Sequence, residues 1–297
     1  MKNLYVISGV TGMTGNELAR QLLNDGHTVI GFDNFFASSI DAVQDIVNNK
    51  NFLFYEYDLN NVEQMSEISR LVGRIQQDYA RTIYINCAAV VHTEHFYEVE
   101  HTFTTNVVSM RSFLQQAISV HADTYINCST SEVYSMQSWN ECGGVKEDDF
   151  LLLATAEHSQ RTSYAVGKLL TEFFMKDAVD KGLIKGCSIR FANVYSNHER
   201  FAKHIIPHII DSLSKTGEVI LLENSKKNMR SFLHNIDSCR AVLELMASTS
   251  ALDGTVYNVA TDEEVSIIDL VKLIADKLNI AEPIIKFEGY RDRKSTR

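Results

Sequence analysis

Short apolar runs alternate with longer amphipathic stretches along most of this chain. The apolar runs have the length of β-strands and occupy residues 4–9, 27–33, 52–58, 82–89 and 123–130. The amphipathic stretches have helical spacing and occupy about 16–24, 62–77, 99–120 and 164–181. Strands that alternate with helices in this way are typical of parallel sheets with crossover helices. The pattern therefore predicts an α/β fold built on a doubly wound parallel sheet.

Composition narrows the class of protein. The chain has 297 residues, enough for one large α/β unit or two smaller domains, and a formal net charge of −10, which argues against a general affinity for nucleic acid or an anionic membrane. The amino-terminal apolar run is too short to span a membrane and lacks the form of a signal peptide. The five cysteines contain no CxxC pair and several lie in apolar runs, which favours reduced core thiols and a cytoplasmic location.

A glycine-rich turn, GVTGMTG, follows the first predicted strand and precedes the first predicted helix. Gly9, Gly12 and Gly15 have the spacing GxxGxxG. Glycines at such a turn let backbone N–H groups approach a pyrophosphate, which the helix dipole also favours. Glycine-rich turns also arise for steric reasons alone, so the motif indicates a dinucleotide site only together with its surroundings.

Acidic residues end the next two predicted strands. Asp33 follows the glycines by about twenty residues, where a carboxylate can accept hydrogen bonds from both ribose hydroxyls and repel a 2′-phosphate. This position predicts NAD, not NADP, as the cofactor. Asp58 ends the third strand and is placed to meet the adenine edge, although it could equally cap the helix that follows.

Two later segments bring together groups that can move protons. The run STSEVY, residues 129–134, combines hydroxyls with a carboxylate at the end of the fifth predicted strand, a composition also found in ordinary turns. Tyr164 and Lys168 lie four residues apart and therefore on one face of a predicted helix. An ammonium beside the phenol would lower the pKa of Tyr164 and make it a usable base, whereas a lysine packed over an aromatic ring is the simpler structural interpretation.

Taken in order, the motifs make the chain similar to the extended short-chain dehydrogenase/reductases, specifically the NAD-dependent nucleotide-sugar epimerase/dehydratase/decarboxylase family. The resemblance covers nearly the whole chain. The matching segments are GVTGMTG (9–15), DNFF (33–36), NCAA (86–89), STSEVY (129–134), YAVGK (164–168), SIRFANVYS (188–196), RSFLHNID (230–237) and GTVYNVATDEEVSI (254–267). Because so many motifs occur in the family's order, chance agreement is improbable.

The resemblance implies a Rossmann-like fold and a set of site residues. The implied catalytic residues are Thr130, Ser131, Glu132, Tyr164 and Lys168. The implied cofactor-binding residues are Gly9, Gly12, Met13, Thr14, Gly15, Asp33, Asn34, Asp58, Leu59, Ala88, Ala89, Asn106, Tyr164 and Lys168. Asn193 and Arg230 match positions that contact the nucleotide diphosphate of the substrate, although an ion pair with Asp237 is an alternative for Arg230.

The reaction implied by the resemblance passes through a 4-keto sugar. Thr130 and Tyr164 would act on the sugar O4 while hydride leaves C4 for NAD, Lys168 would hold the nicotinamide ribose, and Glu132 would remove the C5 proton. Ser131 replaces the aspartate that dTDP-glucose dehydratases use as an acid, so dehydration, decarboxylation and epimerisation all stay open. A family member that binds the dinucleotide without catalysis is a further alternative, which the retained catalytic residues argue against.

The resemblance also implies two interleaved domains and a dimer. We expect a Rossmann-like NAD-binding domain over 1–190 with a return segment at 233–262, and a smaller C-terminal substrate-binding α/β domain over 191–297, mainly 191–232 and 263–297. The helices at about 99–120 and 164–181 would pair with those of a second subunit in a homodimer. The chain stops after YRDRKSTR, which suggests a truncated or disordered carboxyl-terminal helix.

Histidines after the fourth predicted strand raise the question of a metal. His92, His95 and His101 fall within ten residues of one another but lack the spacing of a further ligand. We therefore expect no metal, and expect a nucleotide-diphosphate sugar as the ligand besides NAD.

Overall fold

The computed structural model describes residues 1–134, 144–153, 161–199 and 201–289 of the chain. Its largest element is a seven-stranded sheet in which all neighbouring strands are parallel. In spatial order the strands are β3 (Phe52–Glu56), β2 (Thr28–Asp33), β1 (Leu4–Ser8), β4 (Thr82–Asn86), β5 (Thr124–Thr130), β6 (Lys185–Phe191) and β11 (Asp253–Val259). The predicted doubly wound α/β fold is confirmed.

The order of the strands fixes where a ligand can bind. From β1 the chain runs outward to β2 and β3, and then returns to place β4 on the other side of β1. The connections before and after this switch lie on opposite faces, which leaves a crevice at the carboxyl ends of β1 and β4. The glycine turn, the end of β2 and the end of β5 all open toward this edge.

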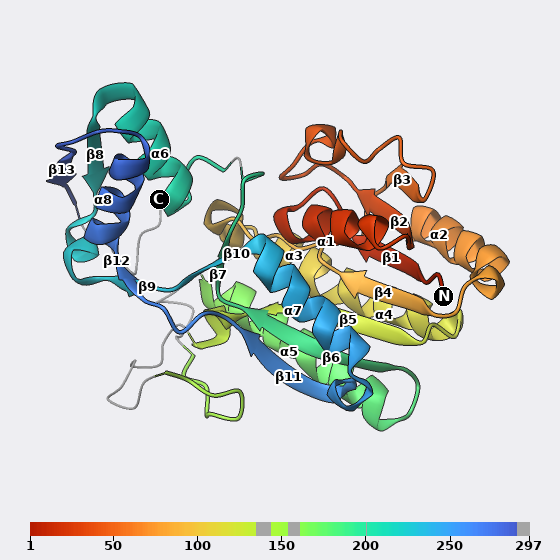
Figure 1. Cartoon of the computed structure of the whole chain (residues 1–297). Coiled ribbons are helices and arrows are strands. Elements are labelled where there is room, and N and C mark those ends of the chain that lie inside the picture. Colours follow the sequence, from red (N-terminus) through yellow and green to blue (C-terminus); the bar gives the residue numbers. More distant parts are fainter. Residues whose placement is uncertain (135–143, 154–160, 200, 290–297) are drawn as a thin grey trace.

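Helices cover both faces of the sheet (Figure 1). One face packs against α1 (Met13–Asn24) and α7 (Asn235–Ala247), and the other against α2 (Val62–Ile75), α4 (Met110–Ser119) and α5 (Arg161–Asp180). Because the central strands are buried on both sides, they read as continuous apolar runs in the sequence.

The helix predicted at about 99–120 forms with an irregular centre. It consists of α3 (Val99–Phe103), a π-helical segment η4 (Thr104–Ser109) and α4. π-Helical turns inside α-helices are frequent at functional sites. Here the segment contains Asn106, whose side chain reaches the loop after β4.

A second, smaller group of elements lies apart from the sheet (Figure 1). Its apolar core is formed by α6 (Ile205–Thr216), β8 (Glu218–Leu221), α8 (Ile267–Lys277) and β13 (Ile284–Phe287). Two short ladders join it to the rest of the chain: β7 (Asn193–Tyr195) with β10 (Phe232–His234), and β9 (Met229–Arg230) with β12 (Val265–Ser266). The predicted domain boundaries stay a prediction, and the expectation for the carboxyl terminus concerns residues outside those described.

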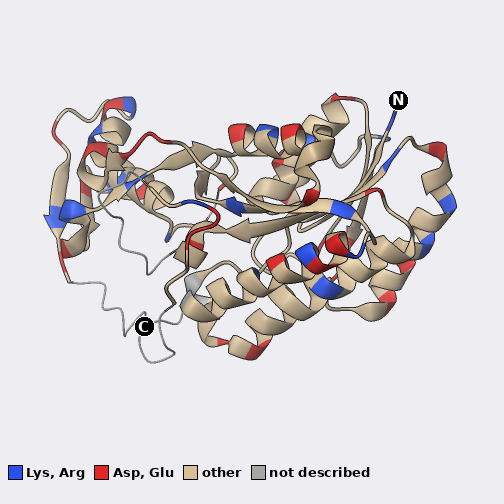
Figure 2. Cartoon of the chain, turned by 90° about the horizontal axis from the view of Figure 1, so that it is seen from below, with Lys and Arg blue, Asp and Glu red and all other residues tan. Residues whose placement is uncertain are grey.

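Short 3₁₀ segments complete the described chain. They are η1 (Ile40–Val43), η2 (Gln76–Asp78), η3 (Thr93–Tyr97), η5 (Ser131–Tyr134), η6 (Glu223–Lys227) and η7 (Thr249–Ala251). Figure 2 shows acidic and basic residues interspersed along the helices around the sheet. Within the described ranges, none of the helices is both long and apolar enough to cross a membrane.

Candidate active site

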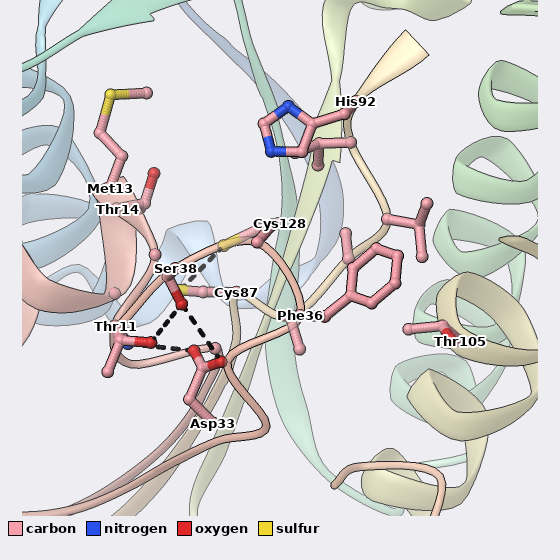
Figure 3. A pocket seen from close by; sticks show the side chains of 18 of the residues that line it. Thr11, Met13, Thr14, Asp33, Phe36, Ser38, Cys87, His92, Thr105 and Cys128 are labelled. Atoms are coloured by element: carbon pink, nitrogen blue, oxygen red, sulfur yellow. Dashed lines mark hydrogen bonds between the residues drawn. The ribbon is translucent and has the colours of Figure 1, made fainter. Parts of the chain in front are cut away.

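A pocket of about 810 Å³ opens at the carboxyl edge of the sheet (Figure 3). Its walls come from the glycine turn, the ends of β2, β4 and β5, the start of α5, and the segment after β6. Sequence segments that were predicted separately therefore meet around one cavity, at the topological switch of the sheet.

The glycine turn is shaped by close backbone contacts. Gly9 has a φ of +69°, and a Cβ on it would lie 2.6 Å from the backbone nitrogen of Ala88. A Cβ on Gly15 would lie 2.2 Å from the carbonyl oxygen of Gly9. Gly12 is the N-cap of α1 and offers no side-chain cap to the first turn of the helix, as a pyrophosphate-binding turn requires.

Asp33 lies directly beside the glycine turn at the pocket wall. Its carboxylate accepts hydrogen bonds from the backbone N–H groups of Thr11, at 3.1 Å, and Phe35, at 3.0 Å. The hydroxyl of Ser38 lies 2.6 Å from that of Thr11 and 3.5 Å from the carboxylate (Figure 3). These contacts fix the carboxylate at the pocket wall, where it can accept from ribose hydroxyls.

Nearly all the residues predicted to bind the cofactor line the same pocket. The lining includes Gly9, Gly12, Met13, Thr14, Gly15, Asp33, Asn34, Asp58, Leu59, Ala88, Ala89, Tyr164 and Lys168. The alternative that Asp58 caps the following helix is wrong, because Asn61 is the N-cap of α2 and accepts from the N–H groups of Glu63 and Gln64. Asp58 instead accepts from the N–H of Asn60 at 2.7 Å.

Thr130, Tyr164 and Lys168 meet on one wall of the pocket. Thr130 ends β5, whereas the other two lie one turn apart on α5. The ring of Tyr164 stacks on Phe96, with centroids 4.7 Å apart. The ammonium of Lys168 donates a hydrogen bond to the carbonyl of Cys128 at 2.8 Å, which locks α5 against β5.

The expected lowering of the pKa of Tyr164 by Lys168 is wrong for this structure. Burial raises the pKa of the Tyr164 phenol well above its ordinary value, the interaction with Thr130 opposes this rise, and the charge of Glu132 adds to it. Burial also lowers the pKa of Lys168, whose ammonium is directed at a backbone carbonyl. The spacing predicted that Lys168 lies one helical turn from Tyr164, as it does, but it could not predict that the ammonium donates to the carbonyl of Cys128.

Ser131 and Glu132 follow Thr130 in the 3₁₀ segment η5 and are half-buried. Neither lines the pocket. The backbone N–H of Glu132 donates to the Thr130 hydroxyl at 3.2 Å, and the negative charge of Glu132 adds to the rise in the pKa of Tyr164. The backbone of Glu132 therefore adjoins Thr130, whereas Ser131 is not brought into the pocket wall.

Three other predicted residues lie outside the pocket lining. Asn106 is buried and braces the loop after β4, donating to the carbonyl of Val90 at 3.1 Å and accepting from its N–H at 2.7 Å. Asn193 is exposed and donates to the carbonyl of Ser231 at 3.1 Å. Arg230 is exposed and donates to the carbonyl of Met229.

The proposed alternative partner of Arg230 is also different in the structure. Asp237 pairs with Arg240 at 3.5 Å, one turn along α7, so the ion pair with Arg230 is wrong. Arg230 and Asp237 belong to one sequence motif, but Arg240 lies three residues after Asp237 on the same helix and pairs with its carboxylate instead.

Phe201 and His204 line the pocket although the sequence analysis did not single them out, and His92, considered there only as a metal ligand, packs against them. The ring of His92 stacks on Phe201, with centroids 3.9 Å apart, and His204, which hydrogen-bonds Glu199, completes this side of the cavity. No local pattern indicated them, because the segments that carry them lie about a hundred residues apart and meet only in the folded chain. Over the described residues, no group of three His, Cys, Asp or Glu side chains is placed to hold a metal ion.

The arrangement fits a dinucleotide. A tight glycine turn, in which a Cβ on Gly15 would clash with the Gly9 carbonyl oxygen, leads into a helix start without a side-chain cap, and Asp33 is held beside this turn. A family model described as the NAD dependent epimerase/dehydratase family matches residues 5–260. The chain belongs to the NAD-dependent epimerase/dehydratase family. The predicted family, enzyme class and NAD cofactor are thereby confirmed.

Relatives of this family member span several reactions. The chain is 23% identical to dTDP-D-glucose 4,6-dehydratase of Mus musculus over 98% of its length and 78% of the relative's. It is 25% identical to UDP-N-acetyl-alpha-D-glucosaminuronate decarboxylase of Bacillus cytotoxicus, covering 96% and 83% of the two chains. The solved structure of UDP-glucuronic acid 4-epimerase from Bacillus cereus, bound to UDP-glucuronic acid and NAD, has a TM-score of 0.82 at 21% identity, with 98% and 88% covered. This epimerase/dehydratase family member is thus similar to enzymes that catalyse different reactions: a dehydratase, a decarboxylase and an epimerase.

Proposed function

We propose that the protein oxidises a nucleotide sugar at C4 and then acts on the resulting 4-keto sugar as an epimerase or dehydratase. The observation that supports this best is the meeting of Thr130, Tyr164 and Lys168 on one wall of the pocket that also contains the glycine turn and Asp33. Bound NAD supplies the hydride acceptor. The relatives named above act on dTDP- and UDP-sugars, which supports this substrate class.

The chain's own residues would divide the remaining work. Thr130 and Tyr164 would hold the sugar O4 and accept its proton, and Lys168 would fix the position of the cofactor's ribose. Glu132, whose backbone N–H bonds the Thr130 hydroxyl, would take the proton from C5 once the neighbouring ketone has made it acidic. Asn193 and Arg230 would reach the nucleotide diphosphate from the β7 and β9 segments, where both are exposed.

Product mass separates the possible outcomes. The protein is incubated with NAD and a panel of UDP-, GDP-, CDP- and dTDP-sugars, and the masses of the products are measured by mass spectrometry. Loss of water indicates a dehydratase, loss of carbon dioxide a decarboxylase, and an unchanged mass with altered stereochemistry an epimerase. No product from any member of the panel would count against the proposal and favour a family member that binds NAD without catalysis.

Two variants separate oxidation at C4 from proton removal at C5. Tyr164→Phe should lose both NADH formation and product, because the phenol oxygen is gone. Glu132→Gln should still form NADH, seen near 340 nm, but accumulate it, since an amide cannot accept the C5 proton. In heavy water the wild type should place deuterium at C5, whereas Glu132→Gln should not. Normal labelling by Glu132→Gln would show that this carboxylate is structural, and an unlabelled, active wild type would favour a C4 epimerase.

The exposed apolar side chains of α3, η4 and α5 favour a homodimer. Six apolar side chains are exposed on the paired helical layer of α3, η4 and α5: Val99, Phe103, Val108, Val166, Leu170 and Phe173. Phe173→Glu should shift the species seen by light scattering toward the monomer, because Phe173 is 64% exposed in one chain. Leu273→Glu is the control, at 57% exposure on α8. A monomeric wild type at micromolar concentration contradicts the dimer. A cytoplasmic location stays a prediction.

A further inference from the structure

Two cysteines face each other at the base of the pocket (Figure 3). Cys87 directly follows β4 and Cys128 lies in β5, and their sulfur atoms are 3.7 Å apart. Both are free thiols, and both line the pocket. We propose that Cys87 and Cys128 are a redox modification site, a dithiol that closes to a disulfide and thereby weakens NAD binding. The proposal rests on the placement of NAD in this pocket.

The strand register brings the two side chains into range. Asn86 of β4 pairs with Asn127 of β5, so the cysteines that follow them are adjacent in a parallel ladder. Neighbouring strands are about 4.8 Å apart, which lies within the Cα separations that disulfides span. A bond of about 2.05 Å requires the sulfurs to approach by roughly 1.6 Å, a movement that side-chain rotation and a small backbone shift can supply.

The surroundings make one thiol the better nucleophile. The hydrogen bond with Cys87 and the charge of Lys168 lower the pKa of Cys128, against the opposing effect of burial, whereas the hydrogen bond with Cys128 and burial raise the pKa of Cys87. The thiolate is the reactive form of cysteine. Cys128 is therefore the sulfur that reacts first with a small oxidant, and Cys87 is placed to resolve the product.

Hydrogen peroxide is an oxidant small enough to reach the two sulfur atoms at the base of the pocket. The Cys128 thiolate attacks one peroxide oxygen, the O–O bond breaks, and a sulfenic acid and hydroxide form. The Cys87 sulfur then attacks the sulfenic sulfur, the S–O bond breaks, and the second hydroxide leaves. With the two thiol protons, two molecules of water result, and the dithiol has given two electrons to one peroxide.

Closing the disulfide disturbs elements that hold the cofactor. A Cβ on Gly9 would lie 2.9 Å from the backbone carbonyl carbon of Cys87, so this backbone is packed directly against the glycine turn. The carbonyl of Cys128 is the acceptor of the Lys168 ammonium, and Thr130 follows two residues later. Any shift of either strand end therefore moves the glycine turn or the Thr130 and Lys168 wall. Linkage is reciprocal, so bound NAD must oppose oxidation by the factor by which the disulfide weakens NAD.

The test uses the full chain, first freed of NAD and treated with hydrogen peroxide. Peptide mapping without reductant should find the Cys87 and Cys128 peptides linked, with loss of two hydrogens. Calorimetry should then give an NAD affinity at least about tenfold lower than that of the same sample reduced with dithiothreitol, a factor that corresponds to about 1.4 kcal/mol. Saturating NAD should slow the formation of the link.

Variants and contrary results make the proposal falsifiable. Cys128→Ser, which lacks the thiol that reacts with peroxide, should have an NAD affinity that peroxide and dithiothreitol no longer change, whereas Cys187→Ala, a buried cysteine in β6, should keep the wild-type response. Absence of the Cys87–Cys128 link after peroxide treatment overturns the proposal, and so does a link that leaves NAD affinity unchanged. Because peptide mapping needs no sugar substrate, a failure of the proposed sugar chemistry is seen separately.

Discussion

Glu172 and Arg190 form a buried ion pair beneath the pocket wall that contains Thr130, Tyr164 and Lys168. Two nitrogens of the guanidinium donate to the two carboxylate oxygens at 3.0 and 2.7 Å, and each side chain is only 5% exposed. Ser129, the neighbour of Thr130, donates to the same carboxylate at 2.5 Å, and Arg190 also donates to the Tyr134 hydroxyl. The pair therefore ties α5, which carries Tyr164 and Lys168, to β5 and β6.

Breaking this pair should destabilise the fold strongly. Arg190→Met leaves a buried carboxylate unpaired and should lower the free energy of unfolding by about 3–5 kcal/mol in urea. Glu172→Gln with Arg190→Met should cost less than the sum of the two single variants, because no buried charge then lacks its partner. Arg240→Met, which breaks the exposed pair with Asp237, should change the free energy of unfolding by no more than about 1 kcal/mol. Equal effects of Arg190→Met and Arg240→Met would contradict the role given to the buried pair.

Replacing a glycine by alanine should weaken NAD binding at one position and stabilise the fold at another. Gly15→Ala places its Cβ 2.2 Å from the Gly9 carbonyl oxygen, so the turn must move and the NAD affinity should fall by at least about tenfold. Gly73→Ala, inside α2 with open space around the new Cβ, should raise the free energy of unfolding by about 0.5–1 kcal/mol. Calorimetry with NAD and urea unfolding measure the two effects. Unchanged NAD affinity in Gly15→Ala would show that the turn does not contact the cofactor.

Asp33 should decide between NAD and NADP. Its carboxylate is fixed by the N–H groups of Thr11 and Phe35 and would repel a 2′-phosphate. Asp33→Ala should weaken NAD by about 1.5–3 kcal/mol, the worth of hydrogen bonds to a charged group, and weaken NADP much less. Asp33→Asn keeps a hydrogen-bond acceptor without the charge, so its NAD affinity should lie between those of the wild type and Asp33→Ala. Equal affinity of the wild type for both dinucleotides would remove Asp33 from this role.

The pH behaviour of Tyr164 should depend on NAD. Burial raises the pKa of the phenol in the free chain, so it should stay protonated as the pH rises past about 10, the ordinary pKa of tyrosine. The positive nicotinamide ring of NAD would favour the phenolate and lower this pKa. The difference in absorbance near 295 nm between wild type and Tyr164→Phe should therefore appear at lower pH with NAD than without it. A difference that starts near pH 10 without NAD would mean that the phenol is not desolvated.

The sequence by itself determined the parallel sheet and the glycine turn that lines the pocket. Buried parallel strands need continuous apolar runs, glycines are required where backbones approach within a Cβ of each other, and a carboxylate must end the second strand to meet a ribose. These requirements are local, so GVTGMTG, Asp33 and the Tyr164–Lys168 pair were found without coordinates. The helix spanning about 99–120 was also found, but its π-helical centre was not.

Only the tertiary structure decided what each side chain contacts. Lys168 bonds a strand carbonyl, Asn106 braces a loop, and His92 meets Phe201 from a segment about a hundred residues away. Cys87 and Cys128 became a pair only when β4 and β5 paired in register. Such contacts depend on distances between segments that have no fixed relation along the chain, and burial sets pKa values that residue type and spacing leave undetermined.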